Sequence, residues 1–201
     1  MRKFLLVGRT GVGKSSFVNS VFGKYITEVS RYEACTKIIN HHVYNSPLGD
    51  VCFIDTPGLA EDDIQCDYNY LELINKSVDL AKIDVLIYMS RLDETRFRAE
   101  EKQTIRLLTE KLGAFIWNKA WLVFTFAASV PNERRPRATV NRKKQIEEFI
   151  KVITLQQNLN PPFEGFQVKL RVDNTVSGWT SSTTPIMSVL TNENKDSEEK
   201  P

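Results

Sequence analysis

The chain has 201 residues, of which 41% are hydrophobic and 26% charged, and its formal net charge is +2. This length allows one sizeable core but not two comfortable domains. Domains that bind nucleic acid usually have a stronger basic bias, so we expect no nucleic-acid partner. No apolar run approaches the ~20 residues that cross a bilayer. The three cysteines (Cys35, Cys52 and Cys66) are too widely spaced for a zinc knuckle, which favours a reduced, cytoplasmic compartment.

Short apolar or β-branched runs alternate along the chain with segments whose apolar residues recur at helical spacing. In chain order, the predicted elements are a strand at 4–7, a helix from Lys14 to Gly23, strands at 37–44 and 51–54, a helix around 71–78, a strand at 84–89, a helix around 105–112, a strand at 121–126, a helix around 146–153 and a strand at 166–172. This alternation predicts a three-layer α/β/α fold with a mostly parallel sheet of six strands. Residues 1–190 are expected to form the domain, and residues 191–201 a disordered polar tail.

A glycine-rich segment lies between the first predicted strand and the first predicted helix. Residues 8–15 read Gly-Arg-Thr-Gly-Val-Gly-Lys-Ser, which matches the phosphate-loop pattern in the context that the pattern requires. Glycines let backbone amides turn inward around a β-phosphate, and the helix amino end adds a favourable dipole. We expect Lys14 to reach the β- and γ-phosphates and the Ser15 hydroxyl to ligate Mg²⁺. The predicted nucleotide contacts of this loop are Arg9, Thr10, Gly11, Val12, Gly13, Lys14, Ser15 and Ser16.

A second element, Asp55-Thr56-Pro57-Gly58, follows the predicted strand at 51–54. These four residues alone would fit a plain turn. After a phosphate loop they favour a switch element, in which the Asp55 carboxylate holds Mg²⁺ through its water shell and the Gly58 amide contacts a γ-phosphate. Thr36, between the first helix and the strand at 37–44, is positioned to close over Mg²⁺ when a triphosphate is bound. The expected metal residues are therefore Ser15, Thr36 and Asp55.

Five segments together resemble the septin-related (paraseptin) GTPases. These segments are Gly8–Ser16, Ala34-Cys35-Thr36-Lys37, Asp55–Leu59, Arg91-Leu92-Asp93 followed by Arg96, and Ile116–Ala120. The first three are shared with the immunity-associated (GIMAP, AIG-type) GTPases, and the last two are closer to the Toc-like chloroplast import receptors. The resemblance covers residues 1 to about 174. It implies a G domain that binds GTP or GDP with Mg²⁺ and forms a homodimer through its nucleotide face, often with peripheral attachment to an organelle membrane.

The segments expected to recognise the base depart from the usual GTPase pattern, Asn/Thr-Lys-x-Asp. The chain has Thr125-Phe126-Ala127-Ala128, which lacks the acidic residue. Toc-like proteins have Thr-His-Ala here, so the resemblance places Phe126 against the purine; the alternative is a core residue of the strand. Asp173 and Asn174 resemble the family's late Glu-Asn pair and would supply the missing acceptor, although Asp-Asn also fits a plain turn. The choice of guanine over adenine therefore depends on the resemblance.

The residues expected to act in hydrolysis are Lys14, Thr36 and Arg96. Leu59 stands where Ras-like enzymes have a water-orienting glutamine, which predicts slow GTP hydrolysis. The resemblance implies that Arg96 reaches the nucleotide of a partner copy; the alternative is a solvated arginine at a helix start. Two other functions stay open: a nucleotide-loaded scaffold for assembly or membrane docking that does not hydrolyse, and an ATPase.

Two further groups of residues have simple interpretations. His41 and His42 lie in a predicted strand and are interpreted as an edge pair rather than as a general base. A basic segment that straddles a Pro-rich loop and the start of a helix is interpreted as a solvated surface, with docking on anionic lipid as the alternative. Its members are Arg134, Arg135, Arg137, Arg142, Lys143 and Lys144.

Overall fold

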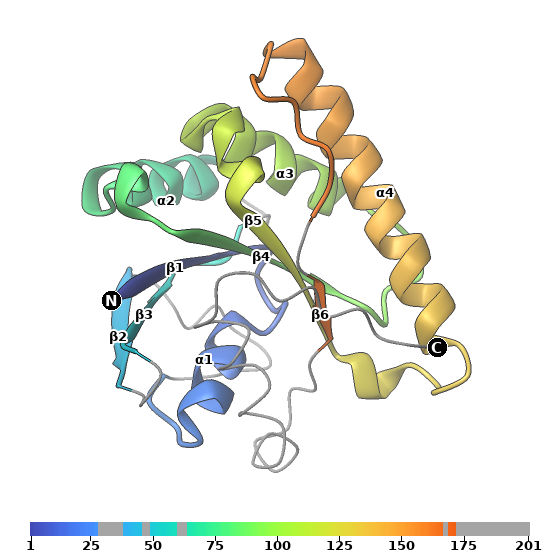
Figure 1. Ribbon diagram of the computed structural model, residues 1–201, viewed down its shortest axis with the longest axis horizontal. Coiled ribbons are helices and arrows are strands. Elements are labelled where there is room, and N and C mark those ends of the chain that lie inside the picture. Colours follow the sequence, from blue (N-terminus) through green and yellow to red (C-terminus); the bar gives the residue numbers. More distant parts are fainter. Residues whose placement is uncertain (28–37, 46–48, 60–63, 167–168, 172–201) are drawn as a thin grey trace.

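The computed structural model describes residues 1–27, 38–45, 49–59, 64–166 and 169–171, and these form a sheet with helices on both faces (Figure 1). The strands are β1 (Arg2–Val7), β2 (Asn40–Tyr44), β3 (Val51–Asp55), β4 (Val85–Arg91), β5 (Ala120–Thr125) and β6 (Lys169–Arg171). They lie in the order β2-β3-β1-β4-β5-β6, and every neighbouring pair is parallel except β2 and β3. The predicted six-stranded, mostly parallel sheet is confirmed.

Within the described residues, four α-helices cover this sheet. They are α1 (Lys14–Phe22), α2 (Ile64–Ser77), α3 (Ala99–Leu112) and α4 (Arg135–Gln156). The 3₁₀ helices η1 (Leu80–Lys82), η2 (Ala114–Lys119) and η3 (Ala127–Ser129) lie in connections between helices and strands. Figure 1 shows α1 on one face of the sheet and α2, α3 and α4 on the other. The three-layer prediction is therefore confirmed. Among the helices of the described residues, none combines the length and the apolar character that a membrane span needs.

The sheet separates two hydrophobic cores. On the α1 side, Phe4 stacks on Phe53 with ring centroids 5.4 Å apart, and Phe17 meets Phe53 edge-on. On the opposite side, Trp117 is 1% exposed, and its indole Nε1 donates to the Thr109 hydroxyl at 2.8 Å. The segment Ile116–Ala120 that marked the family resemblance is thus a packing element: it buries an aromatic ring against β4 and α3.

Several predicted boundaries differ from the structure. β5 ends at Thr125, because Phe126 adopts a left-handed conformation (φ 55°) that a strand cannot continue. Phe166 lies before β6 in a loop and packs on Trp117. β2 is an edge strand, so the interpretation of His41 and His42 as an edge pair is confirmed. The calls on Thr36, Asp173, Asn174 and residues 191–201 lie outside the described residues.

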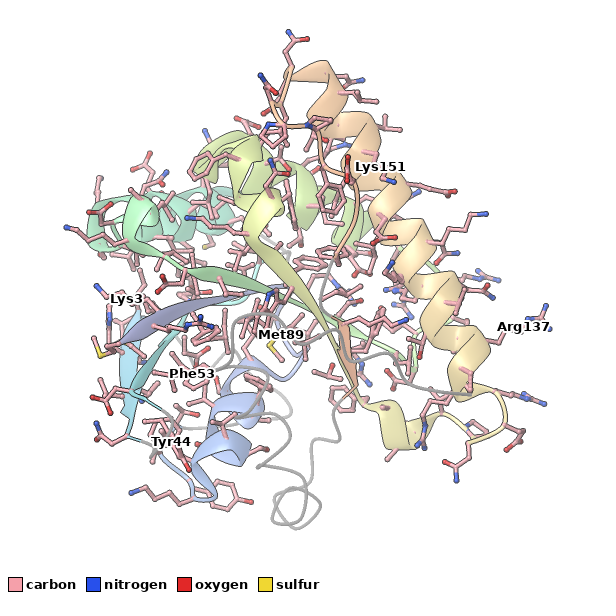
Figure 2. All side chains as sticks on the ribbon, viewed as in Figure 1. Lys3, Tyr44, Phe53, Met89, Arg137 and Lys151 are labelled. Carbon is pink, nitrogen blue, oxygen red and sulfur yellow. The ribbon has the colours of Figure 1, made fainter. Side chains whose placement is uncertain are left out.

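Arg142 does not belong to the basic surface on which the sequence analysis placed it. Arg137 extends from α4 into solvent (Figure 2), whereas the Arg142 side chain is 3% exposed. Its guanidinium pairs with the buried carboxylate of Glu101 on α3. The other Glu101 oxygen accepts from the Ser90 hydroxyl at 2.6 Å. The interpretation of Arg142 as solvated is therefore wrong: it is the cation that neutralises a carboxylate inside the core between α3, α4 and β4.

Replacing Arg142 with methionine tests this buried pair. Arg142→Met leaves the Glu101 charge buried without its cation, so the free energy of unfolding falls by about 3–5 kcal/mol. Lys144→Met, on the same helix with 71% of its side chain exposed, is the matched control and changes it by less than about 0.5 kcal/mol. The double variant Arg142→Met/Glu101→Leu regains most of the loss. Urea unfolding measures all three, and equal stability of Arg142→Met and wild type would contradict the assignment.

Candidate nucleotide-binding site

The phosphate loop runs from the end of β1 to the start of α1, and two of its glycines fix its path. Gly13 caps α1 with a left-handed backbone (φ 92°). A Cβ on Gly8 would lie 2.6 Å from the carbonyl oxygen of Met89, so only glycine lets β1 leave the sheet this close to β4. Because a glycine cap has no side chain to satisfy the first amides of α1, an anion is the natural partner of this helix end.

Lys14 is buried at the centre of this loop. Its Nζ donates to the carbonyl oxygens of Gly8 at 3.2 Å and Arg9 at 3.1 Å, and the residue is 6% exposed. The ammonium therefore lies inside the curve of the loop rather than in solvent. A phosphate held by the loop would meet a cation that is already in place.

Ser15 and Asp55 meet at the carboxyl ends of β1 and β3. The Ser15 hydroxyl donates to Asp55 Oδ2 at 2.8 Å, and Asp55 is 0% exposed. The other carboxylate oxygen, Oδ1, is buried and has no hydrogen-bond partner among the described residues. Burial raises the pKa of the Asp55 carboxyl, against the opposing effects of Lys14 and Ser15. A buried, unpaired carboxylate oxygen beside a hydroxyl is a hard oxygen donor set, so these residues fit Mg²⁺.

The segment after β3 packs directly on the phosphate loop. The Leu59 amide donates to the Gly8 carbonyl at 3.2 Å, and the Thr10 amide donates to the Leu59 carbonyl at 2.9 Å. A Cβ on Gly58 would collide with Thr10, so the close approach requires glycine at this position. Leu59 is 1% exposed and belongs to the core. Because this side chain is aliphatic and buried, it cannot form the hydrogen bond with which a glutamine would orient a water molecule.

The predicted contact residues of the loop divide into backbone and side-chain roles. The Val12 side chain is 1% exposed in the core on the α1 side, so only its main chain faces the loop interior. The Arg9 guanidinium turns to Glu94 in the β4–α3 connection, with its Nη2 2.6 Å from the carboxylate. Arg9 therefore contributes its carbonyl oxygen to the site, where it accepts from Lys14, while its guanidinium pairs with Glu94 outside the loop. Thr10, Gly11 and Ser16 are at least partly accessible at the site.

Phe126 lies just beyond β5 and is half-buried, so the alternative of a core strand residue is wrong. The guanidinium carbon of Arg91 lies 3.8 Å from the centroid of the Phe126 ring. Arg91 in turn donates two hydrogen bonds to Asp93, at 3.0 and 2.7 Å. One face of the aromatic ring is thus already covered by a cation that a carboxylate holds in place. A purine that stacks on Phe126 would use the other face.

Arg96 is exposed on the connection between β4 and α3, at the carboxyl edge of the sheet. Its carbonyl accepts from Arg142 Nη1 at 2.7 Å. Sequence reasoning missed this contact and the Arg9–Glu94 ion pair, because each joins residues far apart in the chain and neither Arg142 nor Glu94 belongs to a motif. Thr36, Asp173 and Asn174 lie outside the described residues, so their predicted contacts stay predictions.

A comparison with protein families matches residues 2–160 to the AIG1 family. The chain belongs to the AIG1 family. Among curated relatives, it is 34% identical over 151 residues to translocase of chloroplast 33 from Arabidopsis thaliana. That match covers 74% of this chain and 50% of the relative, so this chain spans about half of the relative's length.

Solved structures give the same result. Toc33 from Arabidopsis thaliana in complex with GDP and Mg²⁺ superposes with a TM-score of 0.72 and is 29% identical, over 87% of this chain and 71% of that one. A second solved structure concerns the chloroplast translocon components atToc33 and psToc159, for whose GTPase activity dimerisation is important. It superposes on this chain with a TM-score of 0.74 and is 30% identical. It covers 87% of this chain and 70% of that one. The predicted resemblance to Toc-like and AIG-type proteins is confirmed.

Replacing Asp55 with asparagine separates the two effects of its charge. Asp55→Asn removes a buried carboxylate whose pKa is raised by burial, so the free energy of unfolding of the nucleotide-free protein increases. The same variant loses the extra stability that Mg²⁺ gives the nucleotide-bound wild type, because a neutral amide binds the cation weakly. Asp50→Asn, at an exposed position, is the control and changes neither quantity. Thermal unfolding with nucleotide plus Mg²⁺ or EDTA measures both; unchanged stabilisation by Mg²⁺ in Asp55→Asn would contradict the metal site.

Proposed function

We propose that this chain is a guanine-nucleotide switch that binds GTP or GDP with Mg²⁺, hydrolyses GTP slowly, and is regulated by pairing through its nucleotide face. The observation that carries the proposal is the Ser15–Asp55 pair next to a glycine-rich loop at a helix amino end. One buried oxygen of this pair has no hydrogen-bond partner among the residues that the structure describes. The GDP and Mg²⁺ complex of Toc33 supports the same assignment.

The roles of the residues follow from their positions. The loop amides from Gly11 to Ser15 surround the β-phosphate, and the Lys14 ammonium moves from the carbonyls of Gly8 and Arg9 to the β- and γ-phosphates. Ser15 and Asp55 hold Mg²⁺, directly and through its water shell, and Thr36 closes over it in the triphosphate state. Bound Mg²⁺ supplies positive charge to the phosphate oxygens. The Gly58 amide contacts the γ-phosphate.

Base recognition is proposed for Phe126, Asp173 and Asn174. The free face of the Phe126 ring stacks on the purine, while the Arg91 guanidinium supports the other face. An aromatic stack alone does not distinguish guanine from adenine, so the Asp173 carboxylate, with Asn174 beside it, supplies the acceptor for the guanine N1 and N2 groups. The GDP-bound relative supports guanine over adenine.

Slow hydrolysis follows from the residue after Gly58. Leu59 is buried and pairs with the phosphate loop through its main chain, so its side chain orients no water. The same observation favours a second candidate function, a nucleotide-loaded scaffold that does not hydrolyse usefully. Single-turnover release of phosphate from bound GTP separates the two: release within minutes to hours supports a slow GTPase, and none over a day supports the scaffold. Competition between GTP and ATP excludes or supports an ATPase.

The proposal extends to partners and location. Relatives in which dimerisation is important for GTPase activity support a homodimer, and chloroplast translocases among the relatives support a cytoplasmic location at the surface of an organelle membrane. Contact with that membrane would be peripheral for the helices described above. Exposed basic residues on α4, such as Arg137 and Lys144, fit the anionic lipid alternative of the sequence analysis.

Replacing Lys14 with alanine tests the phosphate contact. Lys14→Ala removes the cation from the β- and γ-phosphates, so GTP affinity falls about a hundredfold, which corresponds to ~2.7 kcal/mol. Lys76→Ala is the control, because Lys76 is exposed on α2, where its ammonium pairs with the equally exposed Glu72 carboxylate. Calorimetry of both variants, after their folding is checked by circular dichroism, measures the difference. Equal GTP affinity for Lys14→Ala and wild type would contradict a contact between Lys14 and the phosphates.

Replacing Arg96 with alanine tests the dimer. A pair of identical chains is isologous, so one change alters both halves of the interface. Arg96→Ala therefore weakens nucleotide-dependent dimerisation by at least about tenfold, or ~1.4 kcal/mol, and leaves nucleotide affinity of the monomer unchanged. Loss of turnover appears only at concentrations at which the wild type pairs. Sedimentation with GTP and with GDP measures the effect. A wild-type chain that stays monomeric with both nucleotides would contradict a role of Arg96 in dimerisation.

A further inference from the structure

Glu94 is the meeting point of three arginines from separate parts of the chain. Its Oε2 lies 2.6 Å from Arg9 Nη2 in the phosphate loop and 3.7 Å from Arg142 Nη2 on α4, and its Oε1 lies 4.0 Å from Arg91 Nε at the end of β4. The Glu94 side chain is 15% exposed and that of Arg9 13% exposed. The attraction within an ion pair shielded to this degree is screened less by solvent than the attraction within an exposed surface pair. The carboxylate therefore joins the phosphate loop to the β4–α3 connection.

That connection, residues 92–98, carries Arg96, and it is anchored at both ends. Before Glu94, the Leu92 amide donates to the Thr125 carbonyl at 2.9 Å, and the Leu92 side chain is buried. After it, Arg142 holds the Arg96 carbonyl, and Phe97 packs edge-on against Phe149 with ring centroids 5.6 Å apart. The exposed Arg96 side chain extends from a main chain that has little freedom to move.

Arg9 links this connection to the nucleotide site. Its carbonyl accepts from Lys14 Nζ at 3.1 Å, its main chain pairs with Leu59, and its guanidinium bonds Glu94. A single residue therefore contacts the phosphate-binding lysine, the switch segment and the connection that carries Arg96. Removing the Glu94 carboxylate would cut the last of these contacts and leave the guanidinium groups of Arg9, Arg91 and Arg142 without the anion they share.

We propose that Glu94 is a positioning residue: by tying the phosphate loop to the β4–α3 connection, it holds Arg96 in the orientation that reaches a second copy of this chain. The inference rests on the dimerisation proposed above and deepens it, because it assigns the residue that connects the nucleotide site to the dimer face. Glu94 itself touches neither nucleotide nor partner. Its loss acts on pairing through Arg96 and leaves phosphate contacts intact.

The test is a double-variant cycle on dimerisation. Glu94→Gln keeps the shape of the side chain and removes its charge, and it raises the dimer dissociation constant about tenfold, which corresponds to ~1.4 kcal/mol. In the Arg96→Ala background the same change adds less than about twofold, because residues that act as one unit are not additive. Glu72→Gln, 63% exposed on α2, is the matched control and has no effect. Sedimentation with GDP–Mg²⁺ and with GTP–Mg²⁺ gives the constants, and calorimetry gives unchanged GDP affinity for Glu94→Gln.

A merely structural role predicts a different pattern. If Glu94→Gln and Arg96→Ala weaken dimerisation additively, or if Glu94→Gln lowers GDP affinity as much as dimer affinity, the inference is wrong. Glu94→Asp keeps the charge but is one methylene shorter, and it gives an intermediate dissociation constant; it is the second variant if Glu94→Gln lowers the folded fraction. A wild-type chain that never dimerises overturns the proposed pairing and this inference with it. A wild type that pairs through Arg96 but ignores Glu94→Gln overturns the inference alone.

Discussion

A carboxylate buried where two parallel strands end is the constraint on which the rest of the site depends. The register that pairs Leu6 with Asp55 brings the end of β3 beside the start of the phosphate loop. Burying an ion costs several kcal/mol, and here Lys14 and the Ser15 hydroxyl, with smaller contributions from His42 and the Thr56 backbone, offset part of that cost. One oxygen of Asp55 has no hydrogen-bond partner within the described part of the chain. A cation beside this carboxylate would offset the cost of its burial, and this is the reason that we propose Asp55 as part of a Mg²⁺ site.

The fold and the centre of this site could be predicted because their signals are local. Alternating strand and helix patterns predict a parallel sheet, and a parallel sheet places the carboxyl ends of neighbouring strands at one edge. Lys14, Ser15 and Asp55 each follow directly from a short motif at such an end. Their meeting in space then needs only the correct topology, and the structure brings the Ser15 hydroxyl and the Asp55 carboxylate into contact.

The surroundings of the site could not be predicted, because they depend on contacts between distant residues. Glu94 pairs with Arg9, 85 positions away, and no pattern in the sequence connects the two. Arg142 looked like one cation of a surface cluster, yet its helix turns it toward Glu101 in the core. Phe126 looked like the last strand residue, since propensity does not reveal a left-handed backbone. In each case, tertiary packing overrode the local interpretation.

A Mg²⁺-dependent guanine-nucleotide site is tested by titration of the nucleotide-free protein with GDP and with ADP, each in Mg²⁺ and in EDTA. Such a site predicts that GDP in Mg²⁺ binds at least about tenfold more tightly than ADP, a difference of ~1.4 kcal/mol. It also predicts that EDTA weakens GDP binding in the wild type and has no such effect in Asp55→Asn, because the cation acts through that carboxylate. Equal affinities for GDP and ADP, or GDP binding indifferent to Mg²⁺ in the wild type, would contradict a Mg²⁺-dependent guanine-nucleotide site at Ser15 and Asp55.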